Sequence, residues 1–471
     1  MKTLFSKSGI IAIAYFTMLI ISCEKFVDVD VPDHMIVSES VFGDDQSAMS
    51  AMQGVYNELF RADFSSGGGR SVTLLSGLSS DDFKITTSSK EYLEYHGNQI
   101  LIANSYNQVL WSSMYNVVYM ANSILEGVSN SRTLSGAVQQ RLVGEAKFVR
   151  AFCYFYLVNL YGKVPLILGT DYKVNSLASG SDIETIYGQI VLDLNNAIEL
   201  LEVGYADGER THANKFVAKA LLARVHLFQG NWENAKTLSS EIIAQTSTFG
   251  ILDDLDQVFL ANSKEAIWQI SPLGRGNSLT HTEEGNIFIK TSLTNMAIGL
   301  SDNLMDSWDV GDGRHTNWVG RFDGSGPDET YYYPFKYKVR YDNSGGDITE
   351  YSMVLRLAEQ YLIRAEANIK LGNLRAAIAD LDVLRQRAGI SLLADTAPNL
   401  NASDLMEIVL KERRKELFGE WGHRWLDLKR NGIATEVLGE TKDNWDPTAV
   451  LYPIPEDERL KNPNLDQNTG Y

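Results

Sequence analysis

The sequence contains almost no cysteine. Only Cys23 and Cys153 occur among its 471 residues. Cys153 lies in an apolar stretch, where a free cysteine usually acts as a small buried hydrophobic side chain. Since we expect Cys23 to be modified (below), we expect no intramolecular disulfide, and the stability of the fold must come from its core. The chain is long enough for a large core, as one big domain or as two that pack together.

The sequence also lacks the short motifs that mark common catalytic and metal sites. It has no His-Glu-x-x-His, Gly-x-Ser-x-Gly, Gly-x-Gly-x-x-Gly or P-loop pattern. Its seven histidines are scattered without metal-ligand spacing. We therefore expect no metal and no other cofactor. A glycoside hydrolase stays an alternative, because its two carboxylates need to be close in space and not in sequence.

The sequence has fewer basic residues than acidic ones. The sequence has 42 lysines and arginines against 60 aspartates and glutamates, which gives a formal net charge of −18. Such a surface repels phosphate backbones, so we expect no nucleic-acid partner. Asp302, Asp306, Asp309 and Asp312 lie close together but lack the Gly and Glu spacing of a calcium loop. We interpret them as solvated surface residues.

The basic residues of segment 411–430 are interleaved with acids. The cluster Arg413–Lys415 stands among Glu412, Glu416 and Glu420. Interleaved signs favour local ion pairs over a polyanion site. We interpret the segment as a buried helix with ion pairs on its outer face, each worth a few tenths of a kcal/mol.

After residue 22 the sequence lacks any apolar run long enough to span a membrane. Residues 1–22 themselves read as a signal peptide, with Lys2 and Lys7 before an apolar core that is too short to span a bilayer. The core ends in Ile-Ile-Ser and then Cys23, which resembles a bacterial lipobox. We expect residues 1–22 to be removed and Cys23 to become an acylated N-terminus, so that lipid anchors a soluble body. The alternative is an ordinary signal peptide followed by a coincidental cysteine.

What the sequence does contain is a helical hairpin within residues 351–389. Apolar residues recur with helical spacing on both sides of a break at Gly372-Asn373. Gly389 ends the second run, where a C-cap glycine would stand. Small Ala365 and Ala377 would let the two helices approach closely.

A second stretch, residues 216–243, aligns with this hairpin without gaps. Its Gly230-Asn231 break and its small Ala223 and Ala235 fall at matching positions. The two stretches predict a scaffold of tetratricopeptide-like helix pairs separated by long insertions. The alternative is two unrelated amphipathic hairpins.

The rest of the chain divides by composition. We expect a mainly α protein, with a helical part over 23–248, an insertion rich in loops and hairpins over 249–350, and a helical part with a loop-like tail over 351–471. Further helices are predicted at 46–61, 111–125, 140–161, 183–202 and 403–430, strands at 266–270 and 331–339, and irregular structure over 62–100.

Four blocks of sequence then run through almost the whole chain. They are Glu145–Phe155 with Leu160–Leu166, Leu357–Gly389, Glu412–Leu417 with Gly422–Arg430, and Tyr452–Pro455 with Asn462–Leu465 and Gln467–Tyr471. In order and spacing these blocks resemble the SusD/RagB family of Bacteroidetes outer-membrane lipoproteins. Asp312-Gly313-Arg314 also resembles the family's Asp-x-Arg, whereas Thr469 replaces the usual proline before the final Gly-Tyr.

The resemblance implies a non-catalytic surface lipoprotein built on tetratricopeptide-like helix pairs. Members of the family lie over a SusC-like TonB-dependent transporter and capture oligosaccharides or other nutrients for import. We therefore expect a glycan ligand, a SusC-like partner, and an outer-membrane location facing the cell exterior, with lipid as the sole membrane contact. The shared blocks look structural, so the resemblance assigns no ligand-binding residue.

A glycan site needs exposed aromatic rings for the C–H faces of sugars, with polar side chains nearby for the hydroxyls. Two loop regions of the sequence supply both. Our candidates are Arg70, Asp81, Tyr92, Tyr95, His96, Asn98 and Tyr106 in the first region, and Arg275, Asn277, His281, Phe288, Trp318, Tyr331, Tyr332 and Tyr333 in the second. Trp318 is the best single candidate, whereas Trp111, Trp268, Trp421 and Trp425 lie in apolar-periodic contexts typical of a core.

The leading hypothesis is therefore a glycan-binding lipoprotein that works with a transporter. A surface-anchored glycoside hydrolase, a binder of another nutrient such as a peptide, and a protein-interaction scaffold without a small ligand are the alternatives.

Overall fold

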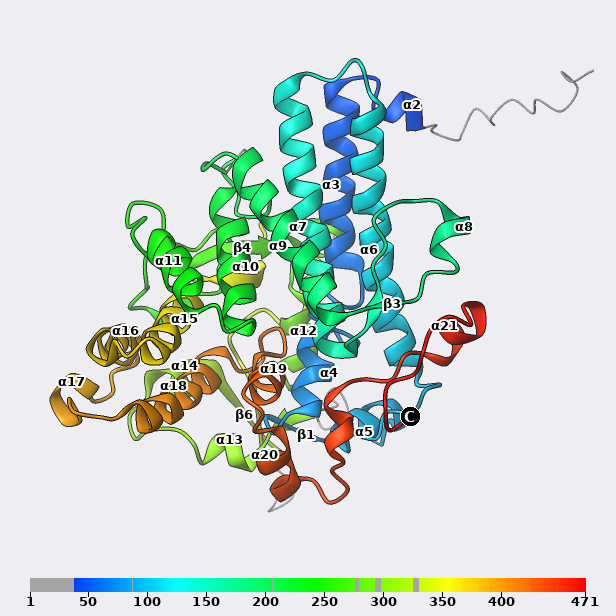
Figure 1. Cartoon of the computed structure of the whole chain (residues 1–471). Helices are drawn as coiled ribbons and strands as arrows, with labels where there is room; N and C mark the ends of the chain where they lie inside the picture. Colours follow the sequence, from blue (N-terminus) through cyan, green and yellow to red (C-terminus); the bar gives the residue numbers. More distant parts are fainter. Residues whose placement is uncertain (1–37, 87, 206, 276–278, 293–297, 325–329) are drawn as a thin grey trace, which may run out of the picture.

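The computed structural model describes residues 38–471, except 87, 206, 276–278, 293–297 and 325–329. Most of this part of the chain is helical, and its strands are short (Figure 1). The mainly α class expected from the sequence is confirmed. The predicted signal peptide and the predicted lipidation residue Cys23 lie outside the described residues.

Long helices form a bundle in the N-terminal part. Helices α3 (Asp45–Arg61), α6 (Ser105–Asn130) and α7 (Gly136–Tyr161) stand side by side in Figure 1, and α9 (Ile183–Leu200) packs along α7. Side-chain oxygens of Asp44 and Asn104 accept from backbone N–H groups of the first turns of α3 and α6, which is what N-cap residues do. The predicted helices of this part are confirmed, and α6 is longer than expected at both ends.

The region 62–100, expected to be irregular, is largely regular. It contains α4 (Val72–Ser79), β1 (Phe83–Ile85) and α5 (Lys90–His96). All eight residues of α4 are buried. A helix that is buried on every side has no polar face, so it shows no helical period in the sequence. The expectation was wrong for this reason.

Two helix pairs stack as the hairpin analysis predicts. Helices α10 (Lys215–Phe228) and α11 (Trp232–Ile243) form the first pair, and α15 (Leu357–Lys370) and α16 (Leu374–Ala388) form the second. Helix α11 packs against α15, and one hydrophobic cluster joins Ala223, Leu227 and Ala235 to Ile363 and Ala367. The tetratricopeptide-like arrangement is confirmed, although more than a hundred residues of chain separate the two pairs.

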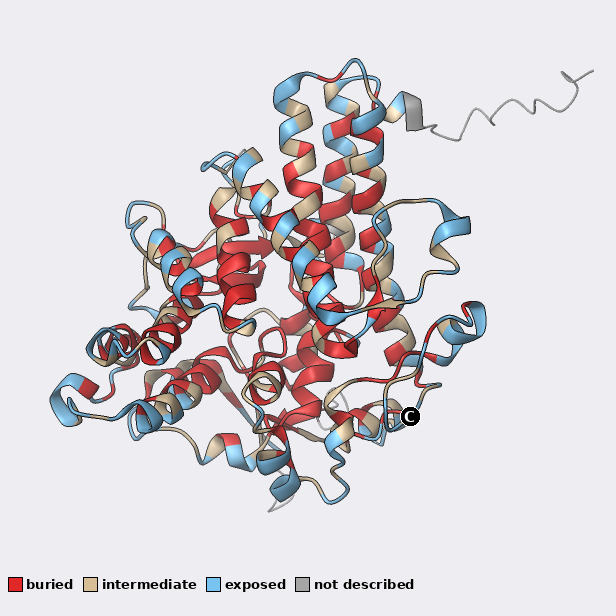
Figure 2. Ribbon diagram, viewed as in Figure 1, coloured by how far each residue is buried: buried red, intermediate tan, exposed pale blue. Residues whose placement is uncertain are grey.

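Residues 352–356, which we included in the helical hairpin, form a strand instead. This strand, β8 (Ser352–Arg356), pairs antiparallel with β4 (Ala266–Ile270), and every residue of both strands is buried. The strand pair links the insertion to the second helix pair. Figure 2 shows buried residues concentrated around β4, α10, α7 and α4.

Other short elements complete the described chain. The strand pairs are β1 with β5 (Ile298–Leu300), β2 (Val164–Pro165) with β3 (Gly180–Ser181), and β6 (Val319–Asp323) with β7 (Thr330–Pro334). The helices are α2 (Ser38–Val41), α8 (Tyr172–Asn175), η2 (Leu255–Gln257), η3 (Pro272–Arg275), α12 (Glu283–Phe288), α13 (Asp302–Met305), α14 (Gly313–Trp318), α17 (Leu393–Thr396), α18 (Ala402–Leu417), α19 (His423–Arg430), α20 (Ala434–Thr441), η4 (Pro447–Val450) and α21 (Glu456–Lys461). The tail is therefore less loop-like than expected.

The helical stretch predicted at 403–430 is broken between α18 and α19. Gly419, Trp421 and Gly422 all have positive φ, at 66°, 46° and 68°. A Cβ on Gly422 would lie 2.6 Å from the Cβ of Ser76, so glycine permits the close approach to α4. The break turns α19 back across α4 and keeps Trp421 and Trp425 in the core, as predicted for these tryptophans.

The charges of 411–430 do not form an exposed outer face. Glu416 is fully buried and contacts Arg314 at 3.2 Å, Arg356 at 2.6 Å and Arg387 at 2.5 Å. Burial alone would raise the pKa of Glu416, but the charges of these arginines outweigh it and hold the pKa well below its ordinary value. The prediction of exposed pairs is wrong, because partners from α14, β8 and α16 enclose the charges. Local pairs do form, between Lys415 and Glu412 and between Arg430 and Asp427, but these are buried as well.

Asp312 belongs to the same buried network. We expected a solvated residue, but Asp312 is 1% exposed, and its carboxylate accepts from Arg314 Nη2 at 2.7 Å. The Asp-x-Arg feature is therefore a buried ion pair at the start of α14.

Candidate functional site

The two loop regions that we selected for a ligand site meet in space. Strand β1 of the first region pairs with β5 of the second, with Phe83 opposite Leu300. The rings of Phe83 and Phe288 lie 5.7 Å apart. Gly67, with φ of 77°, lets the chain pass directly over Glu284, because a Cβ there would lie 2.1 Å from its carboxyl carbon. Residues far apart in the sequence thus build one face of the molecule.

A cleft of about 280 Å³ opens on this face. It is lined by Ser80, Asp81, Phe83, Lys84, His96, Ser301, Asp302, Asn303, Thr441 and Lys442. Two of the predicted residues, Asp81 and His96, take part in it. The lining groups are mostly hydroxyl, amide, carboxylate and ammonium groups, which can donate to and accept from a polyhydroxylated ligand.

The carboxylates of the cleft are engaged by cations. Asp81 Oδ1 accepts from Arg424 Nε at 2.7 Å, and Asp81 Oδ2 forms an ion pair with Arg414 Nη2 at 3.0 Å. Burial opposes the charged form of Asp81, but the Arg424 hydrogen bond and both guanidinium charges outweigh burial, so its pKa lies below the ordinary value. Asp302 pairs with Lys84 Nζ at 2.6 Å. Asp81 therefore lacks the raised pKa that a general acid needs.

Lys442 closes the cleft from the C-terminal part of the chain. Its Nζ donates to the carbonyl oxygens of Leu78 and Ser79 at 2.9 and 2.8 Å, and to Asn98 Oδ1 at 2.7 Å. It therefore satisfies the last carbonyls of α4. Burial lowers the pKa of Lys442 to about 7 and also lowers that of His96. The cleft is thus polar, and burial disfavours the charged forms of Lys442 and His96 within it.

Trp318, our best single candidate, is fully buried. Its indole N–H donates to the carbonyl of Leu255 at 3.1 Å, and the guanidinium of Arg387 lies 5.2 Å from its ring centre. The expectation of an exposed loop ring was wrong, because residues 313–318 form α14 and pack on the buried charge network. A ring without exposed surface is not a platform for a sugar.

Several other candidates are also enclosed. The buried candidates are Asp81, Tyr92, Tyr95, Asn98, His281, Phe288 and Tyr333. Tyr95 packs edge-on against Tyr452 at 5.2 Å, and a ring nitrogen of His281 lies 2.9 Å from the backbone oxygen of Asp342. The sequence could not reveal this, since short helices and loop crossings bury these side chains.

The remaining candidates keep accessible surface where their side chains are described. Arg70 is exposed and pairs with Asp63 at 3.0 Å, and His96, Tyr106, Tyr331 and Tyr332 are half-buried. Arg275 ends η3, but its side chain, like all of Asn277, lies outside the described residues. A role for these residues in ligand binding stays a prediction.

Sequence reasoning missed Lys84, Asn303 and Lys442. They come from three distant segments, and none stands in a motif that would single it out. Within the described ranges, no group of three or more His, Cys, Asp or Glu residues is placed to hold a metal ion. The described helices also include none with the length and hydrophobicity needed to cross a membrane.

Comparison with known proteins gives two family matches. One family, described as the SusD family, matches residues 320–471, and another, described as "Starch-binding associating with outer membrane", matches residues 36–227. SusD-like protein P25 of Formosa agariphila is 25% identical to this chain over 98% of the chain and 99% of its own length.

Solved structures share the fold. A SusD superfamily protein from Bacteroides vulgatus superposes with a TM-score of 0.80 at 20% identity, covering 91% of this chain and all of its own. A laminarin-binding SusD-like protein superposes with a TM-score of 0.76 at 23% identity, covering 90% of this chain and 99% of its own. The two family matches lie on either side of residues 228–319, and the relative from Formosa agariphila covers 98% of the chain. The chain therefore belongs to the SusD/RagB family.

Proposed function

We propose that this protein binds a glycan and delivers it, without chemical change, to a partner TonB-dependent transporter of the SusC type. The observation that carries the proposal is the match of residues 36–227 to a family described as starch-binding and associating with the outer membrane. A structural neighbour that binds laminarin supports the same ligand class. Delivery to a transporter follows from what the SusD/RagB family implies.

The face built by the two loop regions is our proposed place for the glycan. Its cleft offers Asn303, Ser301 and His96 as hydrogen-bonding partners for sugar hydroxyls. The half-buried Tyr331 and Tyr332 on β7 supply ring surface on the same insertion. Because Asp81 and Asp302 are both paired with cations, this cleft favours binding over the hydrolase alternative.

Isothermal titration against a panel of soluble oligosaccharides tests this proposal. We expect at least one member to bind, and His96→Ala combined with Asn303→Ala to weaken that binding. His315→Ala is the matched control, since His315 is also half-buried but does not line the cleft. Binding of a peptide and of no glycan would overturn the ligand class, and sugars released during long incubation would overturn the non-enzymatic reading.

We further propose that Cys23 carries the lipid that holds the protein at the outer membrane, facing the cell exterior. In Figure 1 the described chain begins at α2, at the free end of the bundle, whereas β1, α13 and α20 of the cleft lie at the opposite end. An anchor before α2 would thus leave the cleft away from the point of attachment.

The Cys23→Ser variant should lose its lipid and leave the membrane fraction, because the modified sulfur is the anchoring atom. Fractionation of cells followed by immunodetection measures this. Cys153→Ser is a control for loss of a thiol as such, and unchanged fractionation of Cys23→Ser would disprove the anchor.

A further inference from the structure

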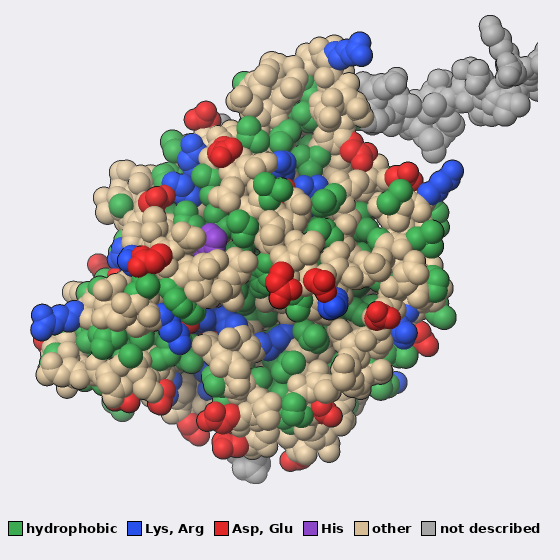
Figure 3. Space-filling view, in the orientation of Figure 1, with side chains coloured by type: hydrophobic (Ala, Val, Ile, Leu, Met, Phe, Trp, Pro, Cys, Tyr) green, Lys and Arg blue, Asp and Glu red, His purple; other side chains and the backbone are tan. Residues whose placement is uncertain are grey.

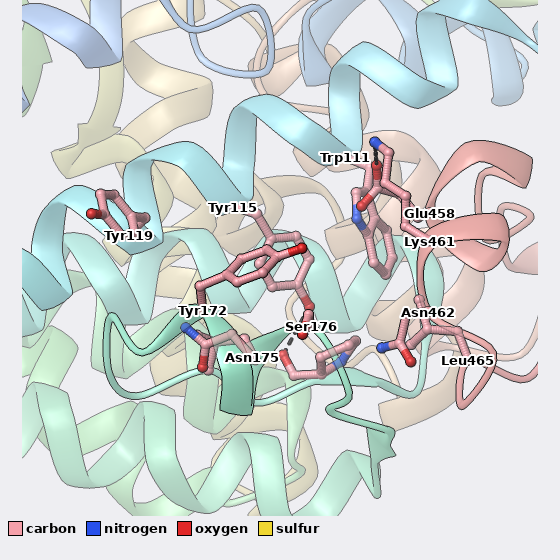
Figure 4. A pocket seen from close by; sticks show the side chains of 12 residues that line it. Trp111, Tyr115, Tyr119, Tyr172, Asn175, Ser176, Glu458, Lys461, Asn462 and Leu465 are labelled. Atoms are coloured by element: carbon pink, nitrogen blue, oxygen red, sulfur yellow. Dashed lines mark hydrogen bonds and ion pairs between the residues drawn. The ribbon is translucent and has the colours of Figure 1, made fainter. Parts of the chain in front are cut away.

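We propose that a second groove, separate from the loop face, binds a neutral oligosaccharide. The groove lies between α6, the segment 165–176 that carries α8, and the tail around α21 (Figure 4). Its volume is about 330 Å³, which is within the range of small-ligand pockets. It is lined by Trp111, Tyr115, Tyr119, Pro165, Ile167, Tyr172, Asn175, Ser176, Glu458, Lys461, Asn462 and Leu465. The ligand class is that of the proposed function, but the groove shares no residue with the cleft.

Aromatic rings form the floor and the edges of this groove. Trp111 and Tyr115 pack together on α6 with ring centres 5.0 Å apart. Tyr119, one turn further along α6, is 53% exposed, and Tyr172 on α8 is 80% exposed. Figure 4 shows the Tyr172 ring extending across the opening beside Tyr115. Exposed rings beside a hollow are what the apolar face of a sugar requires.

Most tyrosines in the described part of the chain are far less exposed than Tyr119 and Tyr172. Within the described ranges, Tyr341 is the third tyrosine that is exposed to this degree, and it does not line the groove. Val174, Leu177 and Leu460 beside the groove are also exposed, and Figure 3 shows hydrophobic side chains among charged ones on the α8 and α21 side of the molecule. Concentrated exposed apolar surface marks a binding site more often than scattered residues do.

Polar groups at the edge of the groove distinguish an oligosaccharide from a purely apolar ligand. The hydroxyls of Tyr119 and Tyr172 and the indole N–H of Trp111 make no hydrogen bond with any described residue. Asn175 uses its Nδ2 to donate to the carbonyl of Gly169 at 3.0 Å, which leaves its Oδ1 to accept. A sugar hydroxyl both donates and accepts, so it can satisfy all of these groups.

The charges at the groove cancel each other. Glu458 accepts from Lys461 Nζ and from Gln108 Nε2, each at 2.9 Å (Figure 4 shows the first contact as a dashed line). No net charge is left to attract a uronate or a sulfated chain, and the net charge of the whole chain, −18, repels one. The groove therefore favours neutral glycans over polyanionic ones.

The segment that carries Tyr172 is fixed at both ends. Asn122 Nδ2 donates to the carbonyl of Ile167 at 3.1 Å, and Thr170 N donates to Glu126 Oε1 at 2.8 Å. From the tail, Asn462 Nδ2 donates to the carbonyl of Ala178 at 2.7 Å. These contacts hold the backbone that carries the Tyr172 ring, so binding costs little ordering of this segment.

The test measures where neutral glycans bind. Maltoheptaose, laminariheptaose, xylohexaose and mannohexaose are the neutral probes, and an oligogalacturonate is the charged probe. Hydroxyl-radical footprinting with mass spectrometry reports protection of Tyr119 and Tyr172, and separately of Tyr331 and Tyr332 on the loop face. We expect at least one neutral probe to protect Tyr119 and Tyr172, and the oligogalacturonate to protect neither.

Titration of variants gives the second readout. The double variant Tyr119→Ala and Tyr172→Ala should weaken binding of that probe by about ten-fold or more, which is the size of a loss at a central contact residue. Tyr341→Ala is the matched control and should bind as the unchanged protein does. Both rings are exposed, so circular dichroism should show an unchanged fold.

The outcomes separate the two proposals. Protection of Tyr331 and Tyr332 without protection of Tyr119 and Tyr172 would overturn the groove and leave the proposed function standing. Tighter binding of the oligogalacturonate at the groove would overturn its neutral ligand class. Protection of the groove by transporter-containing membranes, and by no glycan, would assign it to a protein partner and overturn the proposal. No binding of any probe would overturn both.

Discussion

At the scale of single residues, Glu284 is a buried carboxyl group with few hydrogen bonds to stabilise its charged form. It lies under Gly67, its Oε1 contacts the hydroxyl of Ser352, and its Oε2 has no hydrogen-bond partner in the described part of the chain. Burial raises its pKa from an ordinary value of 4.5 to about 8. The side chain is therefore protonated in the folded protein at neutral pH.

Glu284→Gln should remove a pH dependence of stability. The folded protein keeps this proton while the unfolded chain releases it above 4.5, so the contribution of Glu284 to stability falls as the pH rises from 4.5 through about 8. The slope is at most about 1.4 kcal/mol per pH unit. Urea unfolding at pH 6, 7 and 8 should show that the variant loses less stability than the unchanged protein.

The control is Glu440→Gln at an exposed position of α20. It should leave the pH dependence unaltered. Parallel pH curves for Glu284→Gln and the unchanged protein would mean that Glu284 is charged in the folded state.

At the scale of elements, two glycines show that the backbone conformation of a position decides whether alanine stabilises or destabilises the fold there. Gly372 follows α15 with φ of 79°, whereas Gly54 lies inside α3. A Cβ at either glycine would meet nothing within 4 Å. Substitution by alanine therefore tests backbone conformation alone at both positions.

Gly372→Ala should lower the free energy of unfolding by about 1 kcal/mol, because an L-residue is strained in the left-handed region. Gly54→Ala should raise it by about 0.5 to 1 kcal/mol, because alanine loses less backbone freedom in a helix than glycine does. Thermal and urea unfolding measure both. Shifts of the same sign in both variants would contradict the assigned backbone conformations.

At the scale of the whole molecule, the buried network around Glu416 ties distant segments together. Glu416 comes from α18, and its partners Arg314, Arg356 and Arg387 come from α14, β8 and α16. Arg356 and Arg387 also share Glu265, at 2.9 and 3.1 Å. The insertion and the C-terminal helices thus meet at one set of charges.

Glu416→Ala should lower the free energy of unfolding by about 3 to 5 kcal/mol, because it leaves buried guanidinium groups without a counter-charge. Glu407→Ala, at an exposed position of the same helix, should change it by less than about 0.5 kcal/mol. Urea denaturation followed by circular dichroism compares the two. Equal effects would show that the network does not stabilise the fold.

The sequence by itself determined the helix pairs, the family and the burial of Trp111, Trp268, Trp421 and Trp425. These features rest on local information: helical spacing around Gly372, a C-cap at Gly389 with φ of 72°, and blocks of contiguous residues. Helical periodicity survives only where one face stays polar. That is why α15 and α16 were predictable, whereas the fully buried α4 was not.

Only the tertiary structure decided which polar and aromatic side chains are buried. It brought α10 and α11 against α15 and α16, enclosed Glu416 and Trp318, and left Tyr119 and Tyr172 exposed beside a groove. Burial depends on what packs against a side chain, and the packing partners here come from segments far apart in the chain. The family resemblance indicated a glycan ligand, but only the packing of α6, α8 and α21 forms the groove that Tyr119 and Tyr172 line.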